Sequence, residues 1–235
     1  MRRVVGSFTE PAAQAVQEIH MQALTKSQGR ALKTNALKHA ALGFRAHSGW
    51  AALVVVAAPS RSPAVIDRRR IELVDPGIPK QPYHAAQKLD LKEAEELVRR
   101  CTETARLLAR RAFRAVIDDL RGKGHDVVGC GILLGSGRPA TTLAATLASH
   151  ALIHTAEGEL FRDALSHASE RCDLRVTGVP ERELYARGTL ELRLPVDKLR
   201  SRVTELGRPI GPPWTQDEKH AALVAWLVLA AAAQR

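Results

Sequence analysis

A strand-length run of mainly apolar residues, DVVGCGILL at 126–134, limits the fold of this chain more than any other feature. An uninterrupted run of this kind, in place of alternating polar and apolar residues, is typical of a strand that is covered on both faces. Long helical patterns precede and follow it, at 90–122 and at roughly 141–171. The centre of the chain is therefore predicted to be a sheet with helices packed against it.

Two strand-like runs at 49–58 and 64–74 are joined by a Pro/Ser turn and predict a β-hairpin. The first is apolar and β-branched, and the second contains Arg68, Arg69 and Arg70, which suits an edge or half-exposed strand. The later elements are a short strand at 174–180, a helix at 195–207, and a last helix that opens on the capping-box pair Thr215 and Glu218. Right-handed crossovers would make the later strands parallel. The order of elements therefore predicts an α/β domain built on a mixed sheet.

The 235 residues, of which 45% are hydrophobic, are enough for one such domain with an extension. Residues 1–40 are polar, weakly periodic and basic, so we expect an N-terminal extension there and a single domain over 41–235. The longest apolar run, at 51–58, is too short to cross a bilayer, and the N-terminal residues lack the apolar core of a signal peptide. The three cysteines are far apart and form no CxxC pair. These features predict a cytoplasmic protein without a membrane partner.

The formal net charge of +10 favours acidic partners such as nucleic acid. A GC-rich coding bias is the alternative explanation, because arginines number 26 against nine lysines in an alanine-rich chain. The arginines of the 90–122 helix fall opposite its apolar face. This side is either a solvated surface or a groove that follows a phosphate backbone. Its members are Arg99, Arg100, Arg106, Arg110, Arg111 and Arg114.

The helix expected over 141–171 carries polar residues where apolar ones belong. His150, His154 and Glu157 are spaced i, i+4 and i+7 and fall within the apolar arc. A buried carboxylate without a partner costs several kcal/mol, so Glu157 requires a partner, a raised pKa or an opening to solvent. Three interpretations stay open: a structural hydrogen-bond network, an acid/base or ligand-binding site, or a site for Zn²⁺ or Mn²⁺.

Two other stretches are candidates. The turn GSGRP at 135–139 offers Ser136, Gly137 and Arg138 to a phosphate if a helix starts directly behind it, although a glycine at a tight turn needs no ligand. Asp217 opens the last helix, where capping and the helix dipole explain an acidic residue without any chemistry.

The chain contains, in this order, ALGFRAHSGWAALVVV, a hairpin, a long helix, DVVGCGILL, a helix with Glu157, a short strand and a last helix with Asp217. This series of elements resembles the ribonuclease H-like superfamily. The small bacterial Holliday-junction resolvases are the most similar members, and the resemblance covers about 42–232. It implies a ribonuclease H-like mixed sheet. It also implies two metal ions held by carboxylates on the first strand, the following elements and the last helix, where Glu157 and Asp217 would fill the second and last roles.

The first strand departs from that pattern, because GFRAHSGWAAL has Arg45, His47 and Ser48 and no aspartate. The strand end GCGILLGSG has no acidic residue either. A repurposed or non-catalytic member, from a bacterial branch with no implied activity, is therefore an equal alternative to a two-metal nuclease.

Two functional hypotheses follow. The first is a hydrolase of nucleic acid or another phosphate-bearing substrate, with Glu157, His154, His150 and Asp217 as catalytic residues and a divalent ion (Mg²⁺, Mn²⁺ or Zn²⁺) as the possible cofactor. The second is a non-catalytic protein that binds nucleic acid or serves in an assembly. The sequence decides neither the substrate nor the oligomeric state.

Overall fold

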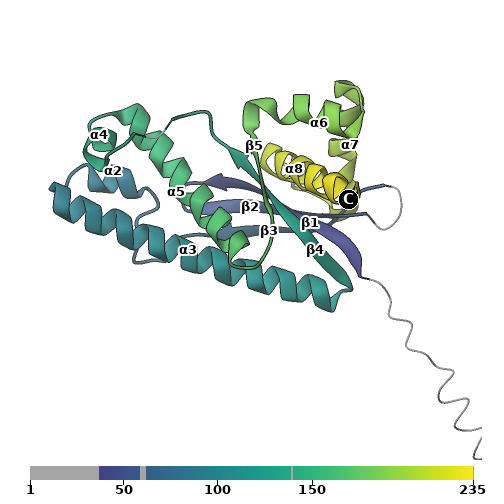
Figure 1. Cartoon of the computed structure of the whole chain (residues 1–235), viewed down its shortest axis with the longest axis horizontal. Coiled ribbons are helices and arrows are strands. Elements are labelled where there is room, and N and C mark those ends of the chain that lie inside the picture. The colour runs from purple at the N-terminus through teal and green to yellow at the C-terminus, as the bar shows by residue number, and fades with distance from the viewer. Residues whose placement is uncertain (1–36, 59–61, 139, 235) are drawn as a thin grey trace, which may run out of the picture. The chain divides into compact units, whose positions relative to one another are not determined.

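The computed structural model describes residues 37–58, 62–138 and 140–234. A five-stranded mixed sheet lies at their centre and helices cover both faces (Figure 1). Most of the predicted extension 1–40 lies outside the described residues. Residues 38–40 belong to the first strand of the sheet.

The strands are β1 (Lys38–His47), β2 (Trp50–Ala57), β3 (Ala64–Glu72), β4 (His125–Leu134) and β5 (Val176–Pro180), in the spatial order β3-β2-β1-β4-β5. The first three strands form an antiparallel meander, and β4 and β5 continue the sheet in parallel with β1. This is the mixed sheet of an α/β domain that the order of elements predicted. The hairpin and the covered strand over 126–134 are confirmed.

The first strand of the sheet, β1, was not predicted as a strand of its own. The stretch GFRAHSGWAAL contains two strands, because the chain turns at Ser48 and Gly49 between β1 and β2. Gly49 has φ of +85°, a conformation that glycine adopts without strain. The turn places His47 opposite Trp50 and leaves the end of β1 free to contribute side chains to a site.

The helices are α2 (Pro82–Ala86), α3 (Leu91–Gly122), α4 (Leu143–Leu147), α5 (His150–Glu170), α6 (Leu184–Leu192), α7 (Val196–Leu206) and α8 (Gln216–Ala232), with 3₁₀ turns η1 (Glu181–Glu183) and η2 (Arg208–Ile210). The helix predicted over 141–171 is therefore two helices, interrupted at Ala148 and Ser149. The short helices α2 and α6 were not predicted. No helix within the described ranges is both long and apolar enough to cross a membrane.

The two faces of the sheet have separate apolar cores. Leu42, Phe44 and Ile132 face α3 and α5, whereas Ala41, Val54 and Val56 face α8. Because side chains alternate along a strand, Arg45 and His47 continue the α8 side of β1. They lie at the carboxyl end of the strand, next to the first turn of α8.

Candidate functional site

Glu157 of α5 holds the first turn of α2. Its side chain is buried, and its Oε1 accepts the backbone N–H groups of Tyr83 (3.0 Å) and His84 (3.1 Å). Gln81 precedes α2 and provides no side-chain cap. Glu157 therefore satisfies N–H groups that have no partner within the helix, which is a structural role for this carboxylate.

The same Oε1 lies 3.1 Å from Nδ1 of the His84 ring. Burial raises the pKa of Glu157, and the hydrogen bonds from His84 and Tyr83 oppose that rise. Its other oxygen, Oε2, is buried without a hydrogen-bond partner among the described residues. The partner of Glu157 is thus His84 of α2, and neither His150 nor His154 of its own helix.

His150 and His154 are exposed, which corrects the prediction that they lie inside the apolar arc. The start of α5 has the short helices α2 and α4 beside it, and these leave both imidazoles uncovered. Their Nε2 atoms are 3.0 Å apart. The ring centroid of His84 lies 4.9 Å from that of His154 and 5.6 Å from that of His150. We call His84, His150 and His154 the imidazole cluster.

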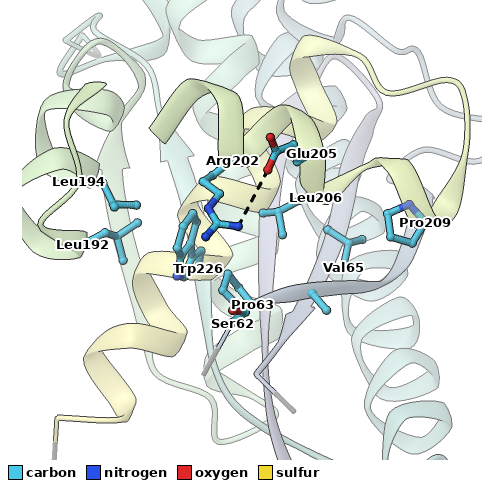
Figure 2. Close-up of a pocket in the computed structure, with 11 residues that line it drawn as sticks. Ser62, Pro63, Val65, Leu192, Leu194, Arg202, Glu205, Leu206, Pro209 and Trp226 are labelled. Atoms are coloured by element: carbon cyan, nitrogen blue, oxygen red, sulfur yellow. Dashed lines mark ion pairs between the residues drawn. The ribbon is translucent and has the colours of Figure 1, made fainter. Parts of the chain in front are cut away.

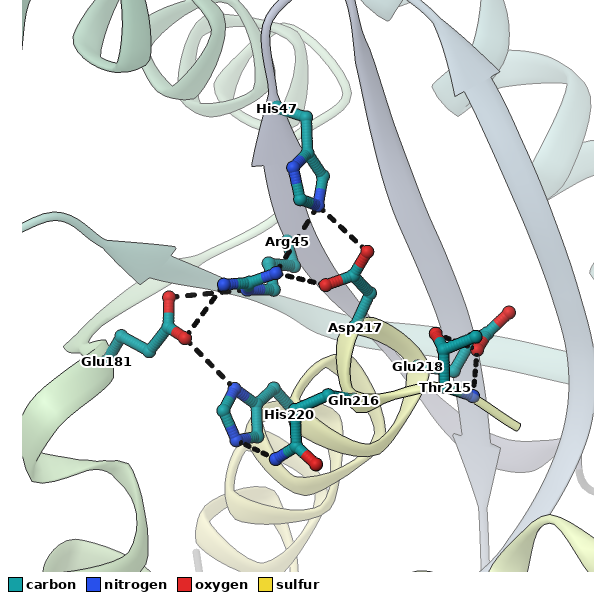
Figure 3. Close-up of polar contacts among 8 residues, drawn as sticks. All are labelled: Arg45, His47, Glu181, Thr215, Gln216, Asp217, Glu218 and His220. Atoms are coloured by element: carbon teal, nitrogen blue, oxygen red, sulfur yellow. Dashed lines mark hydrogen bonds and ion pairs between the residues drawn. The ribbon is translucent and has the colours of Figure 1, made fainter. Parts of the chain in front are cut away.

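Asp217 belongs to a different group of residues, shown in Figure 3. Its carboxylate pairs with the guanidinium of Arg45, and Oδ2 lies 3.0 Å from Nε2 of His47. The same guanidinium donates to Glu181, from Nη2 to Oε1 at 2.9 Å and from Nε to Oε2 at 3.3 Å. Glu157 and Asp217, which the resemblance assigns to one centre, are therefore in separate clusters.

Arg45 lies between two carboxylates that come from distant parts of the chain. Its side chain extends from β1, Asp217 opens α8, and Glu181 follows directly after β5. Burial alone would lower the pKa of Arg45, but the carboxylates of Glu181 and Asp217 hold it above its ordinary value. One guanidinium that is part of the chain therefore contacts both acids at this edge of the sheet.

Glu181 was missed by the sequence analysis. The signal for it was present, because an acidic residue that directly follows a predicted parallel strand lies at the edge where the other strand ends meet. Its position beside Arg45 could not be read from the chain, since the two residues are 136 positions apart.

His220 of α8 completes this group, with Nδ1 3.2 Å from Oε1 of Glu181. Burial and the charge of Arg45 lower its pKa from 6.5, and the nearby carboxylates only partly offset them. Below pH 6.5 the imidazole of His220 therefore binds a proton more readily in the unfolded chain than in the folded chain. We expect the free energy of unfolding to fall as the pH drops from about 6.5 through the lowered pKa of the folded state.

Urea unfolding of the native chain and of His220→Asn at pH 7.5 and 5.5 measures this effect. The loss of stability on acidification should be smaller in the variant, because only the shared titrations remain. An equal loss in both proteins would show that His220 contributes nothing to it.

The predicted phosphate loop does not form the expected strand–turn–helix. Ser136, Gly137 and Arg138 are exposed, and the next helix, α4, begins only at Leu143 behind the cap Thr142. A Cβ on Gly137 would collide with the side chain of Thr155 on α5. Close packing of the loop on α5 thus accounts for this glycine without a ligand, for a reason other than the tight turn that was the alternative.

A cavity of about 400 Å³ lies elsewhere, between the start of β3 and helices α7 and α8 (Figure 2). Its lining is mainly apolar, including Leu192, Leu206 and Trp226. Arg202 and Glu205 form an ion pair at its edge. None of the residues predicted as catalytic or phosphate-binding lines it.

Comparisons with known proteins give only distant similarity. No protein-family model and no curated protein matches the chain. Among solved structures, Thermus thermophilus RuvC in complex with a Holliday junction substrate has 13% sequence identity and a TM-score of 0.48. A second Thermus thermophilus RuvC structure has 11% identity and a TM-score of 0.47. Both similarities cover 83% of this chain and 95% of the other chain.

Proposed function

We propose that this protein binds nucleic acid through the outer face of α3 without two-metal cleavage at the carboxyl ends of its central strands. One observation carries the binding proposal: a row of arginines on α3 without an ion-pair partner among the residues that the structure describes. The row, here called the arginine face, consists of Arg100, Arg110, Arg111, Arg114 and Arg121. None of the five forms an ion pair with another residue of the described ranges.

Two arginines of the predicted set are excluded from the arginine face because they are already paired. Arg99 bonds to Glu96 and Glu103 on its own helix, and Arg106 bonds to Asp163 of α5. The unpaired members lie along one side of the helix from position 100 to position 121. At 1.5 Å per residue that distance is about 32 Å, enough to follow several phosphates of a duplex.

The second half of the proposal rests on Arg45. Two-metal hydrolysis requires carboxylates that surround the ions and clamp the attacking and leaving oxygens. Here the guanidinium of Arg45 lies between Asp217 and Glu181 and satisfies both. A divalent ion would have to displace a positive charge that is covalently part of the chain.

Charge reversal on the arginine face tests the binding. Fluorescence anisotropy with labelled duplex DNA and duplex RNA should show binding whose log affinity falls linearly with log salt concentration. Arg111→Glu combined with Arg114→Glu is expected to reduce the slope by about two, because each lost phosphate contact lowers it by about one.

The control combines Lys198→Glu and Arg208→Glu, which make the same change of charge on exposed residues of α7 and η2. This variant should keep nearly the native slope. A salt dependence that is flat in the native chain, or that falls equally in both variants, would refute binding through the arginine face.

A second candidate function is hydrolysis of a phosphate-bearing substrate at the imidazole cluster. Its support is the convergence of three imidazoles at an exposed position, with the buried carboxylate of Glu157 behind His84. Incubation of the protein with DNA, RNA or a small phosphodiester, in the presence of Mg²⁺, Mn²⁺ or Zn²⁺, tests this function. Cleavage that persists in His154→Ala would exclude the cluster as its source.

A further inference from the structure

We propose that the imidazole cluster binds one divalent transition-metal ion of the zinc class. His84, His150 and His154 are the ligands, and Glu157 is a positioning residue that acts through His84. The proposal is independent of nucleic-acid binding, because its residues are distinct from the arginine face and from the group around Arg45.

The distances suit a small ion. One ligand atom from each histidine can be chosen so that all three lie within 4.8 Å of one another, and the Nε2 atoms of His150 and His154 are already 3.0 Å apart. Tetrahedral zinc with Zn–N bonds of 2.0–2.1 Å separates its nitrogens by about 3.4 Å. The separations present are therefore within about 1.5 Å of those that a tetrahedral ion requires.

The helices bring the three residues together by simple rules. His150 and His154 are spaced i, i+4 on α5, so their side chains stack on one side of that helix. His84 lies in the first turn of α2, which Glu157 of α5 holds in place through the backbone N–H groups of Tyr83 and His84. One buried carboxylate thus fixes the helix that supplies the third imidazole.

Glu157 also selects the ring nitrogen that His84 presents. When Nδ1 of His84 donates to Oε1 of Glu157, Nε2 is the nitrogen with a free lone pair. A carboxylate behind a ligating histidine is a common arrangement in metal sites, where it fixes the tautomer and the ring orientation. Burial of Glu157 strengthens this effect because water does not compete for Oε1.

The donor set discriminates between metals. Imidazole suits Zn²⁺, Cu²⁺, Ni²⁺ and Co²⁺, whereas Mg²⁺ and Ca²⁺ prefer oxygen ligands. His150 and His154 are exposed, so an ion can enter and a fourth position remains open to water. Three protein ligands with one open position are typical of reactive zinc sites rather than of closed structural ones.

Zinc binding to the full chain, stripped with a chelator and titrated in competition with a chromophoric indicator, tests the site. We expect one tight ion per chain. His150→Ala and His154→Ala should each weaken binding at least 100-fold, and both should remain folded because these side chains are exposed. His167→Asn, a histidine near the other end of the same helix, should bind zinc as the native chain does.

The role of Glu157 has its own readout. Glu157→Gln keeps an oxygen for the Tyr83 and His84 N–H groups but weakens the polarisation of the His84 ring. Zinc affinity should fall by about 10–100-fold, and the visible absorption of the Co²⁺-loaded protein should shift, while the unfolding midpoint of the metal-free protein changes little. A native chain that binds zinc no better than a variant with all three histidines replaced by alanine would overturn the proposal. Unchanged affinity and spectrum in Glu157→Gln would overturn the positioning role.

Discussion

Gly43→Ala is expected to lower the free energy of unfolding by about 3 kcal/mol or more, since overpacking a closed contact forces the backbone to move. A Cβ at this position of β1 would overlap the carbonyl oxygen of Ala221 and lie 2.9 Å from Cβ of Ala225. Both belong to α8, and a helix backbone cannot rotate away as a flexible side chain can. Urea denaturation followed by circular dichroism measures the loss.

Two matched variants make this result specific. Gly122→Ala, at the end of α3 with open space around it, should be neutral or stabilising by roughly 0.5–1 kcal/mol, since alanine favours the helix. Gly129→Ala on β4 meets Val228 Cγ1 at 3.0 Å and should give an intermediate loss that can be measured if Gly43→Ala does not fold. Equal stability of Gly43→Ala and Gly122→Ala would contradict the close approach of α8 to the sheet.

Most of the fold was predictable because helices pack closely against both faces of the sheet. Burial on both faces is visible in the sequence as an uninterrupted apolar run, and it identified β4 and β2. The half-exposed β3 was identified as the run that follows the Pro/Ser turn. Hydrophobicity did not identify β1 as a strand of its own, because polar residues at both of its ends, Lys38, His39, Arg45 and His47, interrupt the apolar run. The short helices α2 and α6 contain too few turns to establish a 3.6-residue period.

Only the part of the candidate site that lies on α5 was predicted from the sequence. The spacing of His150, His154 and Glu157 correctly marked α5 as unusual, and the burial of Glu157 is confirmed. Its partner lies 73 positions away on α2, and no periodicity reaches that far. The helical wheel also treated α5 as covered along its whole length, so it placed two exposed histidines in the core.

The lack of an aspartate on the first strand was the most informative local signal at the central edge of the sheet. It indicated that metal chemistry at this edge was in doubt, and the structure supplies the physical reason in the guanidinium of Arg45. What the sequence could not show was that Glu181 lies beside Arg45, where it makes the pair of Arg45 and Asp217 part of a larger ion-pair group. Without Glu181, Arg45 and Asp217 would be an ordinary pair.

Arg45→Asp is expected to cost about 2–4 kcal/mol of folding free energy in the absence of divalent cations. Removal of one partner from a buried ion pair costs roughly 3–5 kcal/mol. The side chain of Arg45 keeps 25% of its surface in solvent, which reduces the cost. The new carboxylate would also repel Asp217 and Glu181. Thermal or urea unfolding at low ionic strength measures the loss.

The same variant should regain stability when Mg²⁺ or Mn²⁺ is added, since an ion that binds only the folded state stabilises it in proportion to the logarithm of its concentration. Arg45→Met removes the charge without adding a carboxylate, so it should be destabilised and should gain less from either ion. The native chain, whose carboxylates already contact a guanidinium, should not respond at this site. If Arg45→Asp and Arg45→Met respond identically, the guanidinium does not occupy the position of a cation, and the ion-pair group is only a structural clamp between β1, β5 and α8.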